Sequence, residues 1–331
     1  MKFNMLVVTD HATHAGTNSV YQLSQAMMKD PRCNQLWVCS RGIEENTSFF
    51  NGEPLAPIYA SRVTPGFDFD PGGHFFHDSS PLDRNHIDAV LIRMPQPVDP
   101  VFLFSLESIA SPERIINSPE GIVETATKEF LLKVSYLCPE PVMCYSIDEA
   151  LAMCREKEIV LKPLHSYGGR GMVRLSKNYS WNENEKFPID HLSSFLTEEH
   201  FPMLSMTFLK NVTMGDKRTI VANNEVLGSA LRMPAPGSWM CNVAQGGHAV
   251  PAEPDEEEMI IERTLTPMLH LKGVIMYGFD TLVDDNGRRV LSEINTLSIG
   301  GLVPLEELTR KPVLSRAARL LWDHVEKGGK Q

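Results

Sequence analysis

The first third of the chain alternates short apolar runs with amphipathic segments, a pattern typical of an α/β domain. Phe3–Thr9, residues 36–39 and Ala89–Arg93 are apolar runs of strand length, and residues 19–28 have the apolar spacing of a helix. Strands that alternate with helices are joined by right-handed crossovers. We therefore expect this region to form a mostly parallel sheet.

Two charged residues stand where strands of this expected sheet end. Asp10 follows the first strand and Arg93 closes the third. Ligands bind at the carboxyl ends of strands in open α/β sheets, but ordinary solvated loops also begin there, and position alone favours neither interpretation. Residues 61–85 are rich in Pro, Gly, Asp and His and are expected to form a long surface loop.

The second part of the chain opens with a clear helix start. Ser118 is a typical N-cap residue, followed by proline at the first helical position and an acid in the first turn. Composition alone places Lys128 on the solvated side of this helix, opposite its apolar stripe. The stripe consists of Ile122, Val123, Ala126, Phe130 and Val134.

The length of 331 residues is enough for two or three domains. A polar stretch at residues 178–186 separates the second part from the remainder of the chain. We expect boundaries near residues 118 and 200, which give three units at 1–117, 118–200 and 201–331.

An Asn-Gly pair near the C-terminal end predicts a β-hairpin. The pair, at residues 286 and 287, lies between two apolar segments at residues 275–283 and Arg289–Asn295. If Asn-Gly forms a two-residue turn, Asp280 lies directly opposite Glu293 in the paired strands.

The facing carboxylates of Asp280 and Glu293 form a candidate metal site. Opposed residues have their Cβ atoms about 5 Å apart, where two like charges destabilise the pair. Asn295 lies on the same face of the hairpin, two residues beyond Glu293. Two carboxylates and an amide oxygen suit Mg²⁺, with water and substrate phosphate completing its coordination. A solvated acidic rim in a different register is the alternative.

Glycine-rich and basic segments suggest anion binding. Residues 162–171 join two expected strands, and the N–H groups of such a loop can surround an anion, although a glycine-rich hairpin turn explains the pattern nearly as well. Basic residues at 215–218 and 230–234, beside a Pro/Gly-rich loop, suit a triphosphate and a mobile lid, with solvated strand charges as the alternative. No G-x-G-x-x-G motif follows the first strand, which argues against a nicotinamide-dependent dehydrogenase.

The charge balance restricts the partners that the protein can have. Lys and Arg number 31 against 42 Asp and Glu, which gives a net charge of −11. Nucleic-acid binding needs a basic face and is not expected, and no apolar run is long enough to span a membrane. The N-terminal residues do not resemble a signal peptide, and the six cysteines include no C-x-x-C pair. We expect a cytoplasmic protein with free thiols.

Six motifs, taken in order along the chain, resemble those of the prokaryotic glutathione synthetases, within the ATP-grasp superfamily. No single motif is decisive, but six in the same order are specific. The resemblance implies an α/β (α+β) ATP-grasp fold, with an N-terminal α/β substrate domain (pre-ATP-grasp), a small lid domain, and a C-terminal domain that carries the metal site. The motifs are Leu91-Ile92-Arg93-Met94 with Asp99, Val160-Leu161-Lys162-Pro163-Leu164 with its glycine-rich loop, Gly215-Asp216-Lys217-Arg218, Leu231-Arg232-Met233-Pro234, residues 242–247, and Ser292-Glu293-Ile294-Asn295.

The resemblance also implies roles for single residues. Lys162 and Arg232 would be catalytic, with Arg232 contacting the transferred phosphoryl group. Mg²⁺, or Mn²⁺ as the alternative, would be held by Asp280, Glu293 and Asn295. ATP would be bound by Lys128, Lys162, Ser166, Gly168, Gly169, Met206, Phe208, Leu209 and Arg232, and the substrates by Asp10, Arg93, Arg218, Asn242 and Ser298.

The implied reaction is the ATP-dependent ligation of a small-molecule carboxylate to an amine through an acyl phosphate, in a homo-oligomer. Departures from the family pattern lie in substrate-facing loops: Met240 stands where an arginine is expected, and residues 296–301 are more apolar. They predict a substrate other than γ-glutamylcysteine plus glycine, with sequence drift in a true glutathione synthetase as the alternative. A regulatory module that binds ATP without turnover is a second hypothesis, although the complete metal-ligand set argues against it.

Overall fold

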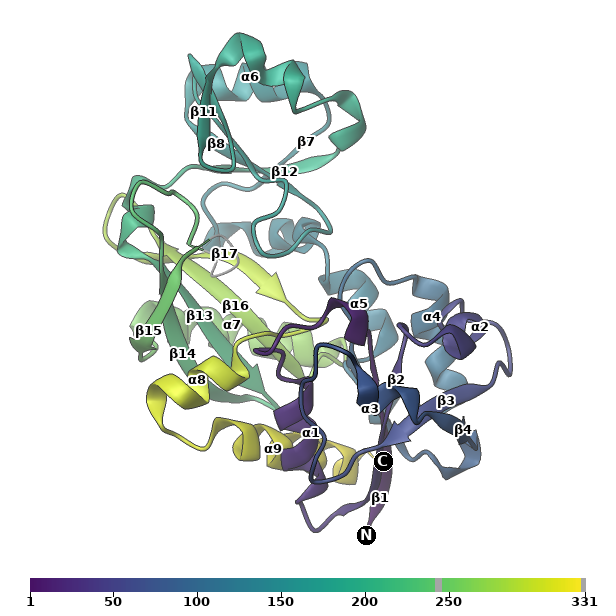
Figure 1. Ribbon diagram of the computed structural model, residues 1–331. Coiled ribbons are helices and arrows are strands. Elements are labelled where there is room, and N and C mark those ends of the chain that lie inside the picture. Colours follow the sequence, from purple (N-terminus) through teal and green to yellow (C-terminus); the bar gives the residue numbers. More distant parts are fainter. Residues whose placement is uncertain (242–245, 329–331) are drawn as a thin grey trace.

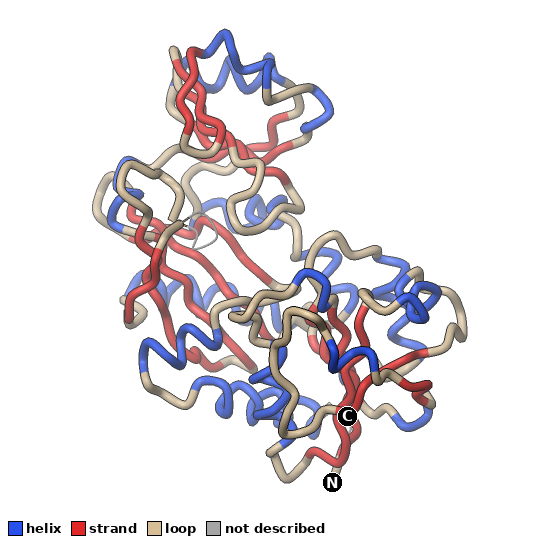
Figure 2. Tube along the Cα trace, in the orientation of Figure 1, coloured by secondary structure: helices blue, strands red, loops and turns tan. Residues whose placement is uncertain are grey.

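Three β-sheets follow one another along residues 1–241 and 246–328, the part of the chain that the computed structural model describes. Figure 1 shows the second sheet standing apart at the top of the molecule, while the first and third lie side by side below it. Figure 2 shows the strands of each sheet as a separate group, with helices around them. No helix in the described ranges is long and apolar enough to cross a membrane.

The first sheet is mostly parallel, as expected. Its central strand β1 (Phe3–Thr9) pairs in parallel with β2 (Cys33–Ser40) and β5 (Ala89–Arg93). Helix α1 (Val20–Met28) connects β1 to β2. Three short strands complete the sheet: parallel β6 (Ile115–Ile116) beside β5, and antiparallel β3 (Ile58–Arg62) and β4 (Ser80–Leu82) beside β2.

The segment at residues 61–85 is more ordered than the expected surface loop. It contains β4 and a short helix, α3 (His74–His77). Phe67 and Phe76 are fully buried in the core of the first domain. The polar composition of the segment concealed the role of these two residues. Two buried aromatic side chains are enough to hold an otherwise hydrophilic segment against the core.

The second sheet is antiparallel and is covered by α6 (Ile147–Glu156). The polar stretch at residues 178–186 is not a separator, because it forms a hairpin inside this sheet. The last strand of the sheet in sequence, β12, lies beyond residue 200. The strands are β7 (Val142–Cys144), β8 (Ile159–Pro163), β9 (Val173–Leu175), β10 (Tyr179–Asn182), β11 (Glu185–Pro188) and β12 (Met203–Thr207).

The expected long helix after Ser118 is broken into two. The hydroxyl of Ser118 accepts the N–H of Gly121 at 3.1 Å, which confirms the N-cap of α5 (Pro119–Thr125). A separate 3₁₀ helix, Lys128–Leu137, begins after Thr127, whose hydroxyl caps it. The break rotates the second helix, so Lys128 is only 7% exposed instead of solvated.

The third sheet is antiparallel, and its two faces have different partners. Helix α7 (Glu256–Leu271) packs on one face, while α8 (Leu302–Thr309) and α9 (Val313–Lys327) join the other face to the core of the first domain. The Trp322 indole of α9 donates to the Met27 carbonyl of α1 at 3.1 Å. The strands are β13 (Asp216–Ala222), β14 (Glu225–Met233), β15 (His248–Ala252), β16 (Met276–Val283) and β17 (Arg289–Asn295).

The turn of the C-terminal hairpin differs from the expected two-residue turn. The N–H of Asp284 bonds to the carbonyl of Arg288 at 2.8 Å, which leaves three residues in the loop. Gly287 takes a φ of +82°, the left-handed conformation that a three-residue loop requires at its last position. The prediction of the Asn-Gly turn was therefore wrong in its length.

The pairing of Asp280 with Glu293 is nevertheless confirmed. Near the loop the strands are offset by one residue from the expected register, with Thr281 opposite Leu291. Ser292 is the extra residue of a β-bulge that restores the expected register beyond it. The longer loop shifts the register by one residue, and the bulge at Ser292 shifts it back. The predicted pair is therefore correct only because these two unpredicted features cancel.

Candidate active site

A cleft of about 480 Å³ lies where the three parts of the chain meet. The first domain contributes the ends of its parallel strands, the second the glycine-rich loop, and the third one face of its sheet. The lining side chains and loops include His14, Asn18, Ser19, Arg93, Gln96, Thr127, Lys128, Ser166, Tyr167, Gly168, Arg218, Ile220, Ala230, Arg232, Ala249, Glu293, Asn295, Ser298 and Leu305.

Strand alternation on β13 separates two groups of charges. Asp216 and Arg218 lie on the cleft face, next to Arg232 on β14 and Asp280 on β16. Lys217, between them in sequence, points to the opposite face and lies under α7. The motif Gly215-Asp216-Lys217-Arg218 therefore supplies both faces of the sheet.

The carboxylate of Asp280 is the centre of the charges in the cleft. Arg218 donates to both of its oxygens, Nε at 2.7 Å and Nη2 at 2.6 Å, and Arg232 Nη2 lies 2.8 Å from Oδ2. Asp280 is 1% exposed. Burial alone would raise the pKa of this carboxyl, but the two guanidinium groups outweigh it and hold the pKa well below its usual value.

Asp216, on the far side of Arg232, has the opposite shift. Its Oδ2 accepts from Arg232 Nη2 at 2.5 Å. Burial raises the pKa of Asp216 to about 6, because Arg232 offsets the burial only in part and the nearby charge of Asp280 adds to it. The pKa of Arg232 is itself raised, since the two carboxylates outweigh the burial that lowers it.

Two buried lysines approach Glu293 from different elements. Lys128 donates to the Ser166 carbonyl of the glycine-rich loop, and its Nζ lies 3.8 Å from Glu293 Oε1. Lys162 on β8 donates to the Ser292 carbonyl at 2.8 Å, which links the second and third sheets. Burial lowers the pKa of Lys162, and Glu293 opposes that shift. The resemblance had assigned both lysines to phosphate.

Several buried polar atoms of the cleft have no hydrogen-bond partner among the described residues. They are Nε and Nη1 of Arg93, Nε of Arg232, Oδ1 of Asp216 and Nδ2 of Asn295. Arg93 uses only Nη2, which donates to Ser19 Oγ at 2.8 Å and to the Ile299 carbonyl at 2.7 Å. Burial lowers its pKa to about 10. A buried donor or acceptor without a partner is costly, and groups of a bound ligand could satisfy these atoms.

The charges of this cleft cluster do not balance. Among the described residues it contains five cations, Arg93, Lys128, Lys162, Arg218 and Arg232, against three carboxylates, Asp216, Asp280 and Glu293. A cleft with an excess of positive charge attracts and holds anions such as phosphate and carboxylate groups. The negative net charge of the whole chain is therefore reversed at this place.

The oxygen donors at β16 and β17 fit a hard divalent cation that arrives with its own phosphate ligands. Asp280 and Glu293 face each other, and Asn295 follows on the same strand with an amide oxygen that could join them. Both oxygens of Asp280 are bonded to Arg218, and one of them also to Arg232, so a cation would replace an arginine there. No group of three or more His, Cys, Asp or Glu in the described ranges is placed to hold a metal ion. Two carboxylates and an amide are few ligands for a resident ion, but they suit Mg²⁺ bound through substrate phosphates.

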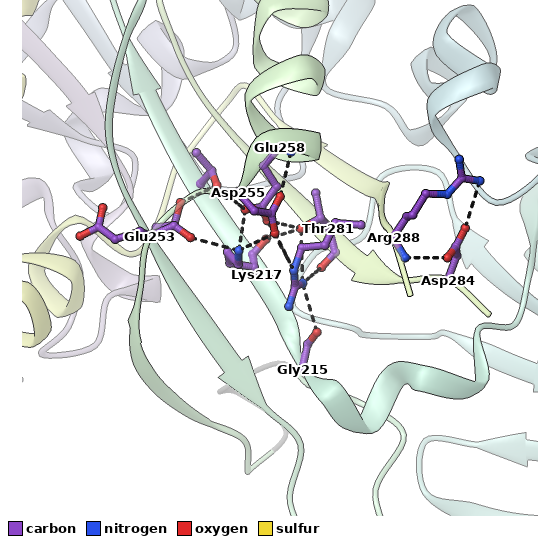
Figure 3. Close-up of polar contacts among 11 residues, drawn as sticks. Gly215, Lys217, Glu253, Asp255, Glu258, Thr281, Asp284 and Arg288 are labelled. Carbon is purple, nitrogen blue, oxygen red and sulfur yellow. Dashed lines mark hydrogen bonds and ion pairs between the residues drawn. The ribbon is translucent and has the colours of Figure 1, made fainter. Parts of the chain in front are cut away.

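A second charge cluster, here called the helix-side cluster, lies under α7 and is buried except at Asp255 (Figure 3). Lys217 Nζ donates to Glu258 Oε2 at 2.7 Å, to Asp255 Oδ2 at 3.0 Å and to a backbone carbonyl. Asp255 and Glu258 form the capping box of α7, and Thr281 also donates to Glu258 at 2.5 Å. Arg289 Nε lies 3.5 Å from Asp255 Oδ2. No sequence signal pointed to this cluster.

Some of the expected site residues lie away from the cleft. Asp10 is not among the lining residues, and its Oδ2 bonds to Arg41 Nε at 3.0 Å. Met206 and Phe208 are buried, and the Phe208 ring lies 3.7 Å from the Arg174 guanidinium. Leu209 is also buried and does not line the cleft, and Gly169 lies on the glycine-rich turn next to lining Gly168. Asn242 falls outside the residues that the structure describes.

Ser19, at the start of α1, bonds to a residue distant in sequence. Its side chain makes no capping hydrogen bond and instead accepts from Arg93. The second partner of Arg93, the Ile299 carbonyl, comes from the loop after Asn295. A contact among three segments so far apart in sequence has no local signal.

Comparison with known proteins identifies the family of the chain. Residues 127–310 match the family described as prokaryotic glutathione synthetase, ATP-grasp domain. The chain belongs to the prokaryotic glutathione synthetase family. The glutathione synthetase of Prochlorococcus marinus (strain MIT 9313) is 30% identical over 240 residues, 70% of this chain and 74% of that protein. That of Bradyrhizobium diazoefficiens is 28% identical over 288 residues, 85% of each chain.

Solved structures agree on the ATP-grasp fold. The D-cycloserine synthetase DcsG matches with a TM-score of 0.65 at 12% identity, covering 97% of this chain and 99% of that one. A RiPP-associated ATP-grasp ligase of Chryseobacterium gregarium, solved with ADP and a leader and core peptide, matches with 0.62 at 16% identity, covering 98% and 97%. Family and fold together confirm that the protein is an ATP-dependent, ADP-forming ligase that makes an amide bond. Membership of this family also implies the use of ATP and a divalent metal ion.

Proposed function

We propose that this glutathione synthetase-like enzyme uses ATP to phosphorylate the carboxylate of one substrate and then joins that acyl group to the amine of a second. The amine attacks the acyl phosphate carbonyl, the C–O bond to phosphate breaks, and inorganic phosphate leaves. The observation that carries the proposal is the convergence of Lys128, Lys162 and Arg232 on the Asp280–Glu293 pair in one cleft. Phosphoryl transfer between two anions depends on such positioned charge.

The cations divide the work by position. Lys128, Lys162 and the glycine-rich loop with Ser166, Gly168 and Gly169 would hold the phosphates of ATP. Arg232 would contact the phosphoryl group in transit and stabilise its charge without any covalent step. Met206, Phe208 and Leu209 would form the nucleotide hinge. Asp280, Glu293 and Asn295 would hold Mg²⁺, with Mn²⁺ as the alternative, and the ion would neutralise charge on the phosphates.

Substrate carboxylates are proposed to bind Arg93 and Arg218. Arg93 supports this role best, because two of its buried nitrogen donors lack partners among the described residues and the residue lines the cleft. Arg218 is committed to Asp280 through both ends of its guanidinium fork, so it would release one of these bonds to bind substrate. Ser298 lines the same cleft, and Asn242 belongs to the motif that follows Met240.

The substrates are proposed to differ from γ-glutamylcysteine plus glycine. Support comes from the apolar loop at residues 296–301, because Leu297 and Ser298 line the cleft. Met240 is 2% exposed, belongs to a separate apolar cluster with Val160 and Phe208, and does not line the cleft. A homo-oligomer in the cytoplasm is part of the same proposal, and the six free thiols support a reducing location.

The test separates the ligase from a module that binds ATP without turnover. The protein is mixed with Mg²⁺, ATP and pairs of candidate acids and amines from a metabolite extract, and ADP, phosphate and new amides are measured by mass spectrometry. Hydroxylamine, added in place of the amine, should trap the acyl phosphate as a hydroxamate. Glu293→Gln is the control and should form neither product. Tight ATP binding without ADP formation for any pair would contradict the proposal.

A further inference from the structure

We infer that the acid substrate carries an uncharged, apolar group, which packs in the half of the cleft formed by β14, β15 and α8. The inference rests on the proposed ligase function and specifies its substrate class. It concerns a part of the cleft that the phosphate-binding residues do not occupy.

The cleft face of the third sheet changes character from one strand to the next. Arg218 on β13 has Asp280 as its neighbour on β16, but Ala230 as its neighbour on β14. Arg232 on β14 has Asp216 on one side and Ala249 of β15 on the other. Charge therefore gathers towards β16 and β17, and small apolar side chains continue towards β15.

Helix α8 closes this apolar half. Pro304 and Leu305 line the cleft from the helix, and Ile220 lines it from β13. Leu305 packs directly over Gly228, where an added Cβ would lie 3.2 Å from Leu305 Cδ2. Leu305 therefore fills the space over Gly228, whereas Ala230 and Ala249 line the cleft, where larger side chains would take up its volume.

The five side chains that bound this half have no donor, acceptor or charge: Ile220, Ala230, Ala249, Pro304 and Leu305. A charged or hydrogen-bonding group placed among these five side chains would lose water and find no partner in any of them, which is costly. An apolar group would gain from leaving water. The position therefore selects against polar substituents as well as in favour of apolar ones.

The acid substrate is thus expected to have two ends of different chemistry. Its reacting carboxylate must reach Arg232 and the phosphates, and a second carboxylate, where present, has the two unpartnered donors of Arg93. The remaining part of the molecule lies against the apolar half and carries a branched aliphatic or aromatic group.

The experiment compares acids of equal size and different polarity, with hydroxylamine as a common amine. The probes are γ-glutamylleucine against γ-glutamylasparagine, with γ-glutamylcysteine and γ-glutamylalanine as smaller members. We expect kcat/KM for the leucine member to exceed that of the asparagine member at least about tenfold, the discrimination typical of a hydrophobic pocket. Calorimetric titration of the same acids in the presence of ADP and Mg²⁺ reads binding without turnover.

Two alanines of β15 provide matched variants. Ala249 lines the cleft, while Ala252 pairs with Ser229 and lies on the opposite face; both are half-exposed. Ala249→Leu should lower kcat/KM for γ-glutamylleucine at least about tenfold and affect γ-glutamylalanine less, because it fills the space. Ala252→Leu should leave both values unchanged.

The outcomes distinguish this inference from the proposed function. Equal turnover or equal affinity for the leucine and asparagine acids would overturn the apolar site while the ligase remains. An equal loss for all acids in Ala249→Leu would also overturn it, since a general structural effect would explain the result. Selective binding of the leucine acid without hydroxamate or ADP would support the apolar site and contradict the ligase.

Discussion

The two faces of β13 carry buried charges that differ in balance and in pairing. In the helix-side cluster, as far as the chain is described, Lys217 and Arg289 face Asp255 and Glu258, and no buried side-chain atom lacks a partner. The cleft cluster has an excess of cations and leaves donors and acceptors unpaired. Burial of charge is therefore not by itself a sign of function. Imbalance and unpaired atoms are the sign.

The largest expected effect is a loss of stability when one cation is removed from the helix-side cluster. Lys217→Met leaves Glu258, which is 0% exposed, without its main cation. Removing one partner of a buried ion pair costs about 3–5 kcal/mol, so we expect that loss in the free energy of unfolding measured with denaturant. Turnover per folded molecule should be retained. Lys177→Met, at an exposed position, is the control and should change stability by less than about 0.5 kcal/mol.

The corresponding change on the cleft side should act on turnover instead. Lys162→Met removes a cation held by a single hydrogen bond to a carbonyl, and burial already disfavours its charge. We expect ADP-forming turnover to fall about 10²–10³-fold, the usual cost of removing a charge-stabilising donor. The free energy of unfolding should change by about 1 kcal/mol or less. A large loss of stability with normal turnover per folded molecule would remove the distinction between the two clusters.

The smallest effect concerns the pH dependence of stability on the cleft side. The pKa of Asp216 is raised by burial from 3.8 to about 6 in the folded protein. Between these values the folded state binds the proton more tightly than the unfolded state, so its contribution to stability is present below pH 3.8 and is lost as the pH rises through 6. Asp216→Asn should remove up to about 3 kcal/mol of this dependence.

Denaturant unfolding of wild type and Asp216→Asn at intervals from pH 4 to 7 measures that contribution, because all other groups titrate in both proteins. The difference between the two curves should grow towards neutral pH in favour of the variant. A difference that is constant with pH would mean that Asp216 ionises normally in the folded state.

Much of the fold and part of the site were predictable from local patterns. Strand β5 has the bounds of its apolar run, and the Asp280–Glu293 pair follows from alternation on two strands. The turn was wrong because loop length and the bulge at Ser292 depend on packing around the hairpin, and only their cancellation preserved the pair.

The burial of Lys128 was missed for a related reason. A helical projection assumes a continuous helix, and the break at Thr127 gave the residue a new direction. The helix-side cluster and the contacts of Arg93 join residues from distant segments, for which the sequence has no period or spacing. The resemblance to a family supplied what local physics could not: that Lys128 and Lys162 belong to the same site.

The hydrogen bond that joins the second and third sheets ends on the backbone of the bulge residue, Ser292, and does not use the side chain at that position. Lys162 donates to the main-chain carbonyl of Ser292, so an alanine there would keep the acceptor. Substitutions of Ser292 should therefore leave this hydrogen bond in place, whereas deletion of one residue would remove the bulge and move the carbonyl. The contact thus depends on the length of the strand and not on the identity of the residue at this position.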